Sequence, residues 1–296
     1  MPLTWLRIRI SIKFSTEVYD WLCLVLKLLV NNAMPSIPVD VLRLILEHVD
    51  KASLAKICRV NKICCSCSQD VLYRDMQFYG YSEDIQVYQL LAQSTHLAQR
   101  VRSFELRRFN YEEGREEDLR KCFRNMIHLR SLRLDVDLSI LDGCTFKLVS
   151  FANGFCYSGS LNRFLNTQPS LTDITLGTCM DTYELRACLP NLTRVTSRFS
   201  WLPQIIPNRP VNEVISLGYT HFGGSIDFGF FALSTSPIQK LTMDQSYLHP
   251  RPGRQLASIF PSLTYLNITA NSKYTFAHIV KESSFFKFIY ILMGLL

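Results

Sequence analysis

The stretch from Ile37 to Phe78 reads IPVDVLRLILEHVDKASLAKICRVNKICCSCSQDVLYRDMQF and decides the expected organisation of the chain. Apolar residues in its first part recur at helical spacing and form one wide stripe: Val41, Leu42, Ile45, Leu46 and Val49. Asp50 or Ser53 can cap a second short helix, and a third apolar set follows. The pattern predicts three short helices, which cannot bury all this apolar surface among themselves and need a neighbouring domain or a partner.

Periodicity alone favours an ordinary three-helix part of a larger core, but the order of the residues indicates more. The run carries these pieces in sequence: Ile37-Pro38, Asp40-Val41-Leu42, Ile45-Leu46, Val49-Asp50, Ser53-Leu54, Val60-Asn61-Lys62 and Leu72-Tyr73-Arg74. With this spacing it resembles the F-box, in the form found in fungi. It departs from the family at Ile63-Cys64-Cys65, where many members have a tryptophan.

The resemblance implies a function and partners. F-boxes dock substrate receptors on the Skp adaptor of cullin ubiquitin ligases, so the expected partners are a Skp-family adaptor and, through it, a cullin. The adaptor-binding residues that the resemblance implies are Ile37, Pro38, Val41, Leu42, Ile45, Leu46, Val49 and Leu54.

After this run a unit of the form apolar-x-x-apolar-x-apolar recurs. Its full copies are Val101-Phe104-Leu106, Leu129-Leu132-Leu134, Phe146-Val149-Phe151, Leu171-Ile174-Leu176, Ile238-Leu241-Met243 and Leu263-Leu266-Ile268. Two weaker copies begin at Leu192 and Val211 and have serine in the last position. Successive copies start 17 to 28 residues apart, a spacing mostly within the range of leucine-rich repeats.

Two folds fit this pattern. Each unit could be an ordinary strand of an α/β domain, but the number of copies favours a repeat. The array resembles the irregular leucine-rich repeats that follow fungal F-boxes. The expected fold class is therefore α+β to α/β: an N-terminal three-helix F-box followed by an irregular leucine-rich-repeat solenoid.

The two ends of the chain differ from its middle. We expect residues 1–33 to be a leader or an extension upstream of a start at Met34. Residues 34–80 would then form the F-box and residues 81–284 the repeat domain. Residues 285–296 are an apolar tail that we interpret as truncated. Neither end carries an apolar run long enough to span a bilayer, so no membrane span is expected.

Composition argues against several classes of function. The net charge is +7, but between Val101 and Asp135 basic residues are interleaved with acidic ones, which is typical of a solvated surface rather than of a nucleic-acid-binding stripe. The ten cysteines are mostly scattered through apolar runs and are expected to be reduced and buried. The CxxC from Cys64 to Cys67 lacks a second ligand pair for zinc, so neither a metal nor another cofactor is expected.

The sequence has no Gly-x-Gly-x-x-Gly, Walker, Gly-x-Ser-x-Gly or HExxH motif. We therefore expect a non-catalytic receptor subunit, cytoplasmic or nuclear, that binds a protein substrate. Two alternatives are a leucine-rich-repeat interaction protein with no ligase role and an enzyme with a dispersed cysteine–histidine site. In the receptor, residues that flank the inward strand positions would bind the substrate: Glu105, Arg107, Arg133, Asp135, Lys240, Thr242, Asp244, Tyr265 and Asn267.

Overall fold

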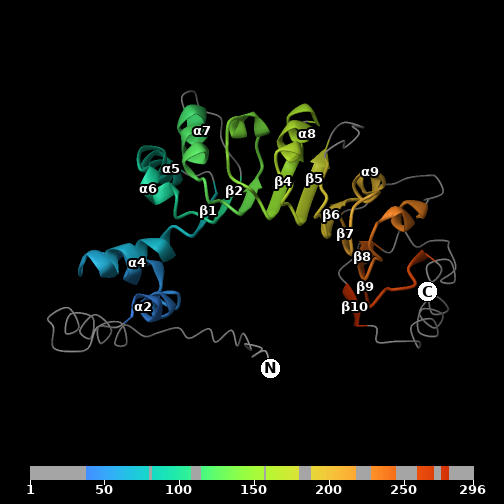
Figure 1. Cartoon of the computed structure of the whole chain (residues 1–296), viewed down its shortest axis with the longest axis horizontal. Coiled ribbons are helices and arrows are strands. Elements are labelled where there is room, and N and C mark those ends of the chain that lie inside the picture. Colours follow the sequence, from blue (N-terminus) through green and yellow to red (C-terminus); the bar gives the residue numbers. More distant parts are fainter. Residues whose placement is uncertain are drawn as a thin grey trace.

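A computed structural model gives the arrangement of most of the chain. It describes residues 38–79, 82–107, 115–156, 158–179, 188–217, 228–244, 259–269 and 275–279. Figure 1 shows one curved sheet with helices along its outer side and a separate group of helices at the N-terminal end of the described chain. The predictions for residues 1–33 and 285–296 fall outside the described residues.

The N-terminal group consists of α2 (Val39–Leu46), α3 (Lys51–Ile57) and α4 (Lys62–Leu72). Side-chain caps fix where the second and third helices begin: Asp50 accepts a hydrogen bond from the backbone N–H of Ser53 at 3.0 Å, and Asn61 from that of Cys64 at 2.7 Å. The three helices share a small core of their own, which consists of Leu42, Leu46, Leu54, Ile57, Cys64 and Cys67.

All ten described strands form one sheet in chain order. They are β1 (Asp75–Phe78), β2 (Ser103–Leu106), β3 (Ser131–Leu134), β4 (Ser150–Cys156), β5 (Asp173–Cys179), β6 (Arg194–Arg198), β7 (Glu213–Leu217), β8 (Lys240–Asp244), β9 (Tyr265–Thr269) and β10 (Thr275–Ile279). Strands β1 to β9 pair in parallel, and β10 pairs antiparallel to β9.

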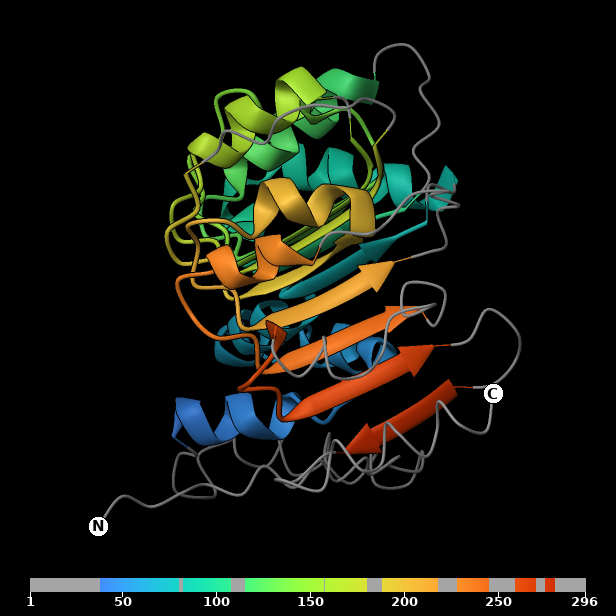
Figure 2. The same cartoon turned by 90° about the vertical axis from the view of Figure 1, so that its right-hand side faces the viewer.

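The helices and 3-10 turns described between the strands lie on one face of the sheet, as Figures 1 and 2 show. They are α5 (Ser82–Gln93), α6 (Thr95–Ala98), α7 (Arg115–Asn125), the 3-10 turn η1 (Leu138–Leu141), α8 (Ser158–Asn166), η2 (Phe199–Trp201), α9 (Leu202–Ile205) and η3 (Gly229–Leu233). The opposite face of the sheet carries no helix of the described chain.

The main core lies between the sheet and these connections. Alternate strand residues point into it, and one fully buried row of the parallel register consists of Phe104, Leu132, Phe151, Ile174, Val195, Val214, Leu241 and Leu266. The ring of Phe104 lies 5.0 Å from that of Phe78 and 5.1 Å from that of Phe123 on α7. Each fully buried side chain of this size contributes about 1.5–3 kcal/mol, so the row ties neighbouring strands and helices together.

The predicted fold class is wrong. The structure is an α/β fold on one continuous, mainly parallel sheet, not a three-helix F-box followed by a leucine-rich-repeat solenoid. A repeat solenoid needs similar connections between its strands. Here α5 and α6 lie between β1 and β2, α7 lies between β2 and β3, and the 3-10 turn η1 lies between β3 and β4. In addition, β1 follows α4 directly and pairs with β2, so the helical start leads straight into the sheet.

One predicted copy of the unit is displaced by two residues. Phe146-Val149-Phe151 was expected to point inward, but Val149 is exposed, and Leu148 and Asn153 are buried on either side of Phe151. Asn153 pairs with Leu134 and Leu176 in the register, so an amide stands where the pattern requires an apolar residue. Its Nδ2 donates to the carbonyl oxygen of Val136 at 3.3 Å, which offsets the cost of burying it.

Candidate protein-binding surfaces

The face of the sheet opposite the helices, called the open face below, presents rows of polar side chains. Side chains alternate across a strand, so burying one set leaves the other set on this face. Its central row in the register consists of Gln77, Glu105, Arg133, Ala152, Thr175, Thr196, Ile215, Thr242 and Asn267. A shallow polar surface without helices is suited to contact another molecule over a wide area.

At the β1–β4 end of the open face, the carboxylate of Glu105 contacts two arginines. Oε1 of Glu105 accepts a hydrogen bond from Nε of Arg107 at 2.5 Å and lies 3.3 Å from Nε of Arg133. The guanidinium of Arg107 also lies over the ring of Tyr79, 5.8 Å from its centroid. The side chain of Glu105 is 16% exposed, whereas both arginines are about half exposed and their outer edges face solvent.

Farther along the sheet, charges alternate from strand to strand. Arg194 lies 3.4 Å from the carboxylate of Asp173 and 3.2 Å from that of Glu213, and Lys240 lies 3.3 Å from Glu213. Burial raises the pKa of the Asp173 carboxyl, and the nearby Arg194 partly offsets this by stabilising the ionised form. We call Asp173, Arg194, Glu213 and Lys240 the charge ladder. Its charges balance one another.

The predicted substrate-binding residues fall into two groups on the open face. Glu105, Arg107, Arg133 and Asp135 lie on β2 and β3 or directly after them, and Lys240, Thr242, Tyr265 and Asn267 lie together on β8 and β9. The side chain of Asp244 lies outside the described part of the chain.

Three members of the charge ladder lie between these groups and were not predicted: Asp173, Arg194 and Glu213. They lie on strands β5 to β7, and in β6 and β7 buried serines, Ser197 and Ser216, replace the last apolar residue of the unit. The alternating signs at the first residue of β5, β6, β7 and β8 were the signal that could have identified them.

The predicted adaptor-binding residues divide between core and surface. Leu42, Leu46 and Leu54 are 5%, 0% and 1% exposed and belong to the core of the helical group, so they cannot form a contact surface. Pro38 and Val41 are exposed, and Ile45 and Val49 are partly buried. Ile37 lies outside the described residues.

Several exposed apolar side chains on these helices were not predicted, notably Val39, Leu44 and Ile63. Leu44 is 61% exposed and Val41 is 45% exposed. Together with Ile45 they occupy positions three and four residues apart on one side of α2, and we call these three residues the α2 strip. The F-box pattern assigns no position to Leu44, so only the structure reveals it.

A network of ionic contacts joins the helical group to the sheet. Asp70 on α4 pairs with Arg43 on α2 at 3.2 Å and with Arg100, which follows α6. Arg100 also donates to the carbonyl oxygen of Ser66 at 3.0 Å, and its Nη2 lies 2.8 Å from Nε2 of His96. The Arg100 side chain is 13% exposed, so these charge-assisted contacts are shielded from solvent and hold the two parts in one orientation.

The described residues also bear on other kinds of site. None of their His, Cys, Asp and Glu side chains form a group of three or more that could bind a metal ion. Seven cysteines of the described chain are free thiols that form no disulfide. No helix in the described ranges is long and apolar enough to cross a membrane.

Comparisons with models of known protein families and with curated proteins find no match.

Proposed function

We propose that this chain is the substrate-recognition subunit of a Skp–cullin–F-box ubiquitin ligase, working in the cytoplasm or nucleus. Helices α2 to α4 dock the adaptor, and the open face of the sheet holds the target protein. The chain needs no catalytic chemistry of its own in this role. It raises the effective concentration of target lysines near the subunits that transfer ubiquitin.

The observation that carries the proposal is the α2 strip. Val41 and Leu44 are large apolar side chains left in solvent by a helical group whose core is already complete without them. They lie within the run of residues that resembles an F-box, and each would gain about 1.5–3 kcal/mol if a partner covered it. An apolar contact of this kind is what docking on an adaptor requires.

The junction through Arg100 supports the second half of the proposal. A receptor must hold its target in a fixed position relative to the adaptor, and the contacts of Asp70 and Arg100 couple the helical group to the sheet. No described helix covers the open face beside this junction, and the face offers both charges and hydroxyl groups to a protein surface.

Pull-down of a purified Skp-family adaptor by the full chain tests the proposal. Val41→Asp and Leu44→Asp each place a charge in the expected contact, and we expect either to weaken adaptor binding by more than about tenfold. Both positions are exposed, so the melting temperature should stay close to that of the wild type. Leu42→Asp is not a suitable test because Leu42 lies in the core.

Leu90→Asp is the matched control. Leu90 is a similarly exposed leucine on α5, in the sheet-associated layer, and its replacement should leave adaptor binding unchanged. If the wild-type chain binds no Skp-family adaptor, the ligase role is wrong and an interaction protein without a ligase link takes its place. For the open face, Arg133→Ala and Tyr265→Ala should reduce target capture without affecting adaptor binding.

A further inference from the structure

Three arginines lie in line where the first three strands begin. Arg74, Arg102 and Arg130 each immediately precede a strand, and they are 28 residues apart in the sequence. The backbone N–H of Arg102 donates to the carbonyl oxygen of Arg74 at 2.9 Å, and that of Arg130 to Arg102 at 2.8 Å. Neighbouring strands are about 4.8 Å apart, so the three residues form one short row, called the arginine rim below.

The described residues neutralise the arginine rim only in part. Arg74 pairs with Glu47 at 2.7 Å, whereas the guanidinium of Arg102 donates only to the uncharged carbonyl oxygens of Gln99 and Val101. Arg130 is exposed, and its side chain makes no hydrogen bond or ion pair with another residue that the structure describes. The pKa of Arg102 is lowered, first by burial and then by the charges of Arg130 and Arg74.

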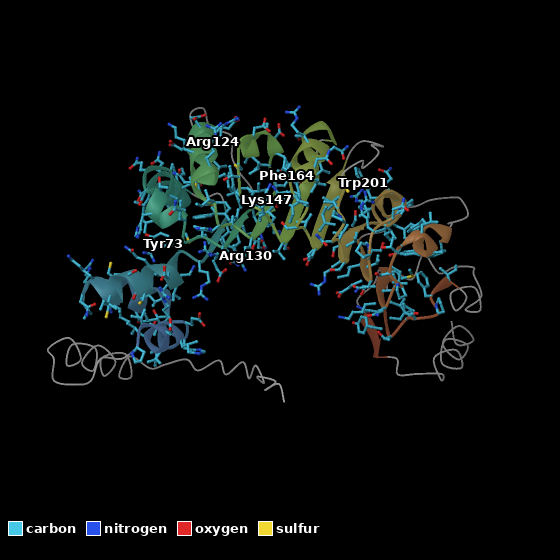
Figure 3. The ribbon with its side chains drawn as sticks, in the orientation of Figure 1. Tyr73, Arg124, Arg130, Lys147, Phe164 and Trp201 are labelled. Atoms are coloured by element: carbon cyan, nitrogen blue, oxygen red, sulfur yellow. The ribbon has the colours of Figure 1, made fainter. Side chains whose placement is uncertain are left out.

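Hydroxyl groups adjoin the rim on the open face. Ser103, Ser131 and Ser150 are the first residues of β2, β3 and β4, and they are neighbours in the register. Figure 3 shows Arg130 on the inner side of the curved sheet, away from the helical layer that carries Arg124. Guanidinium groups and hydroxyls are the donors that bind carboxylate and phosphate oxygens in proteins.

We propose that the arginine rim, with Ser103 and Ser131, binds the oxyanions of an acidic protein segment, either carboxylates or phosphate monoesters. This inference rests on the proposed use of the open face to hold a protein. A bound oxyanion accepts hydrogen bonds from Arg102 and Arg130 and relieves their mutual repulsion. The rim adjoins the helical group, so the acidic segment would lie at the adaptor end of the bound target.

Charge along the rest of the face favours a protein segment over a nucleic acid. The rim spans only three strands, and acidic side chains stand close to it, with Asp75 next to Arg74 and Glu105 on β2. Farther along, Asp173 and Glu213 belong to the charge ladder. A nucleic acid needs cations along many successive phosphates, whereas a short acidic segment needs them only at the rim.

Binding of labelled peptides to the full chain, measured by fluorescence anisotropy at low salt, tests the inference. The probes are three peptides of equal length in which glycine alternates with glutamate, with phosphoserine or with glutamine. We expect both acidic peptides to bind at least about tenfold more tightly than the glutamine peptide and to weaken as salt is added. If the phosphoserine peptide binds more tightly than the glutamate peptide, the site is assigned to phosphate. If it binds no more tightly than the glutamate peptide, the site is assigned to carboxylates.

Arg130→Glu is the principal variant, because Arg130 is exposed whereas Arg102 also donates to backbone carbonyls. It should abolish the preference for acidic peptides. Arg163→Glu reverses the charge of an exposed arginine on α8 and should preserve that preference. Equal binding of all three peptides, or an unchanged preference in Arg130→Glu, overturns the inference. Adaptor pull-down with Arg130→Glu reports on the proposed ligase role separately, because the rim is not part of the α2 strip.

Discussion

The backbone N–H of Gly154 in β4 donates to Oδ1 of Asp135, just after β3, at 3.0 Å. Gly177 in β5 lies next to Gly154, and a Cβ atom at Gly177 would lie 2.5 Å from the carbonyl oxygen of Gly154 and 2.8 Å from its Cα. The obstacle is backbone, which cannot move aside as a side chain can. Strands β4 and β5 therefore approach each other this closely only because Gly177 lacks a side chain.

Gly177→Ala should therefore destabilise the sheet by about 1–3 kcal/mol, the usual cost of overpacking. Gly159→Ala is the control, since no atom lies within 4 Å of a Cβ built there and alanine favours the helix α8 more than glycine does. Denaturant unfolding of both variants measures the difference. Equal stability of Gly177→Ala and the wild type would show that the two strands can separate without cost.

Ser197 and Ser216 are partners in the register of β6 and β7 and face the core. Neither hydroxyl has a hydrogen-bond partner among the described residues. A buried hydroxyl without a partner costs about 1–3 kcal/mol, so Ser197→Ala and Ser216→Ala should each leave stability unchanged or raise it by about 1 kcal/mol. Thermal unfolding provides the measurement. A lower melting temperature in either variant would show that the serine has a partner, such as a buried water.

Asp50 gives the helical group a dependence on pH. Hydrogen bonds from Ser53 lower the pKa of the Asp50 carboxyl below its ordinary value of 3.8, so the folded state favours the ionised form. A lowered pKa in the folded state contributes stability above the ordinary value, and this contribution is lost as the pH falls through the folded value. Asp50→Ala should cost about 1 kcal/mol at neutral pH and reduce the acid sensitivity of helical circular dichroism. The same acid sensitivity in Asp50→Ala would assign it to other carboxylates.

The sequence located the strands well because the signal is local. Phe104 and Leu106, Leu132 and Leu134, and Ile174 and Leu176 each occupy every second position of a single strand, and the structure buries all six. Pairing between strands is not local, so the sequence could not show that β1 joins the same sheet or that β10 runs antiparallel. The error over fold class came from extending a local pattern to the whole architecture.

The candidate surfaces were predicted less well, for a similar reason. Leu42 and Val41 belong to one apolar stripe in the sequence, yet one is core and the other is exposed, because the position of α3 and α4 decides which side of α2 is covered. The charge ladder and the arginine rim depend on the register, which places residues from different strands side by side. Their members are unremarkable when each strand is considered alone.

The last prediction concerns Arg100, whose contacts join the two parts of the molecule. Arg100→Met keeps much of the apolar stem but removes the hydrogen bonds to Ser66 and the ion pair with Asp70, leaving that carboxylate only Arg43. Charge-assisted bonds of this kind contribute about 1.5–3 kcal/mol, so the helical group should separate from the sheet more easily.

Hydrogen exchange resolved along the chain is the measurement for Arg100→Met. We expect faster exchange in α4 and α6 and little change in β4 to β8, which have no contact with Arg100. Arg120→Met is the matched control, because Arg120 is also partly buried but its partners lie outside the helical group: Glu116 on α7 at 2.7 Å and the carbonyl oxygen of Ser139 in η1 at 3.3 Å. It should speed exchange in α7 and η1 and leave α4 unchanged. Unchanged protection of α4 in Arg100→Met would mean that apolar packing, such as that of Tyr73 and Met76 against the main core, holds the helical group in place without the arginine.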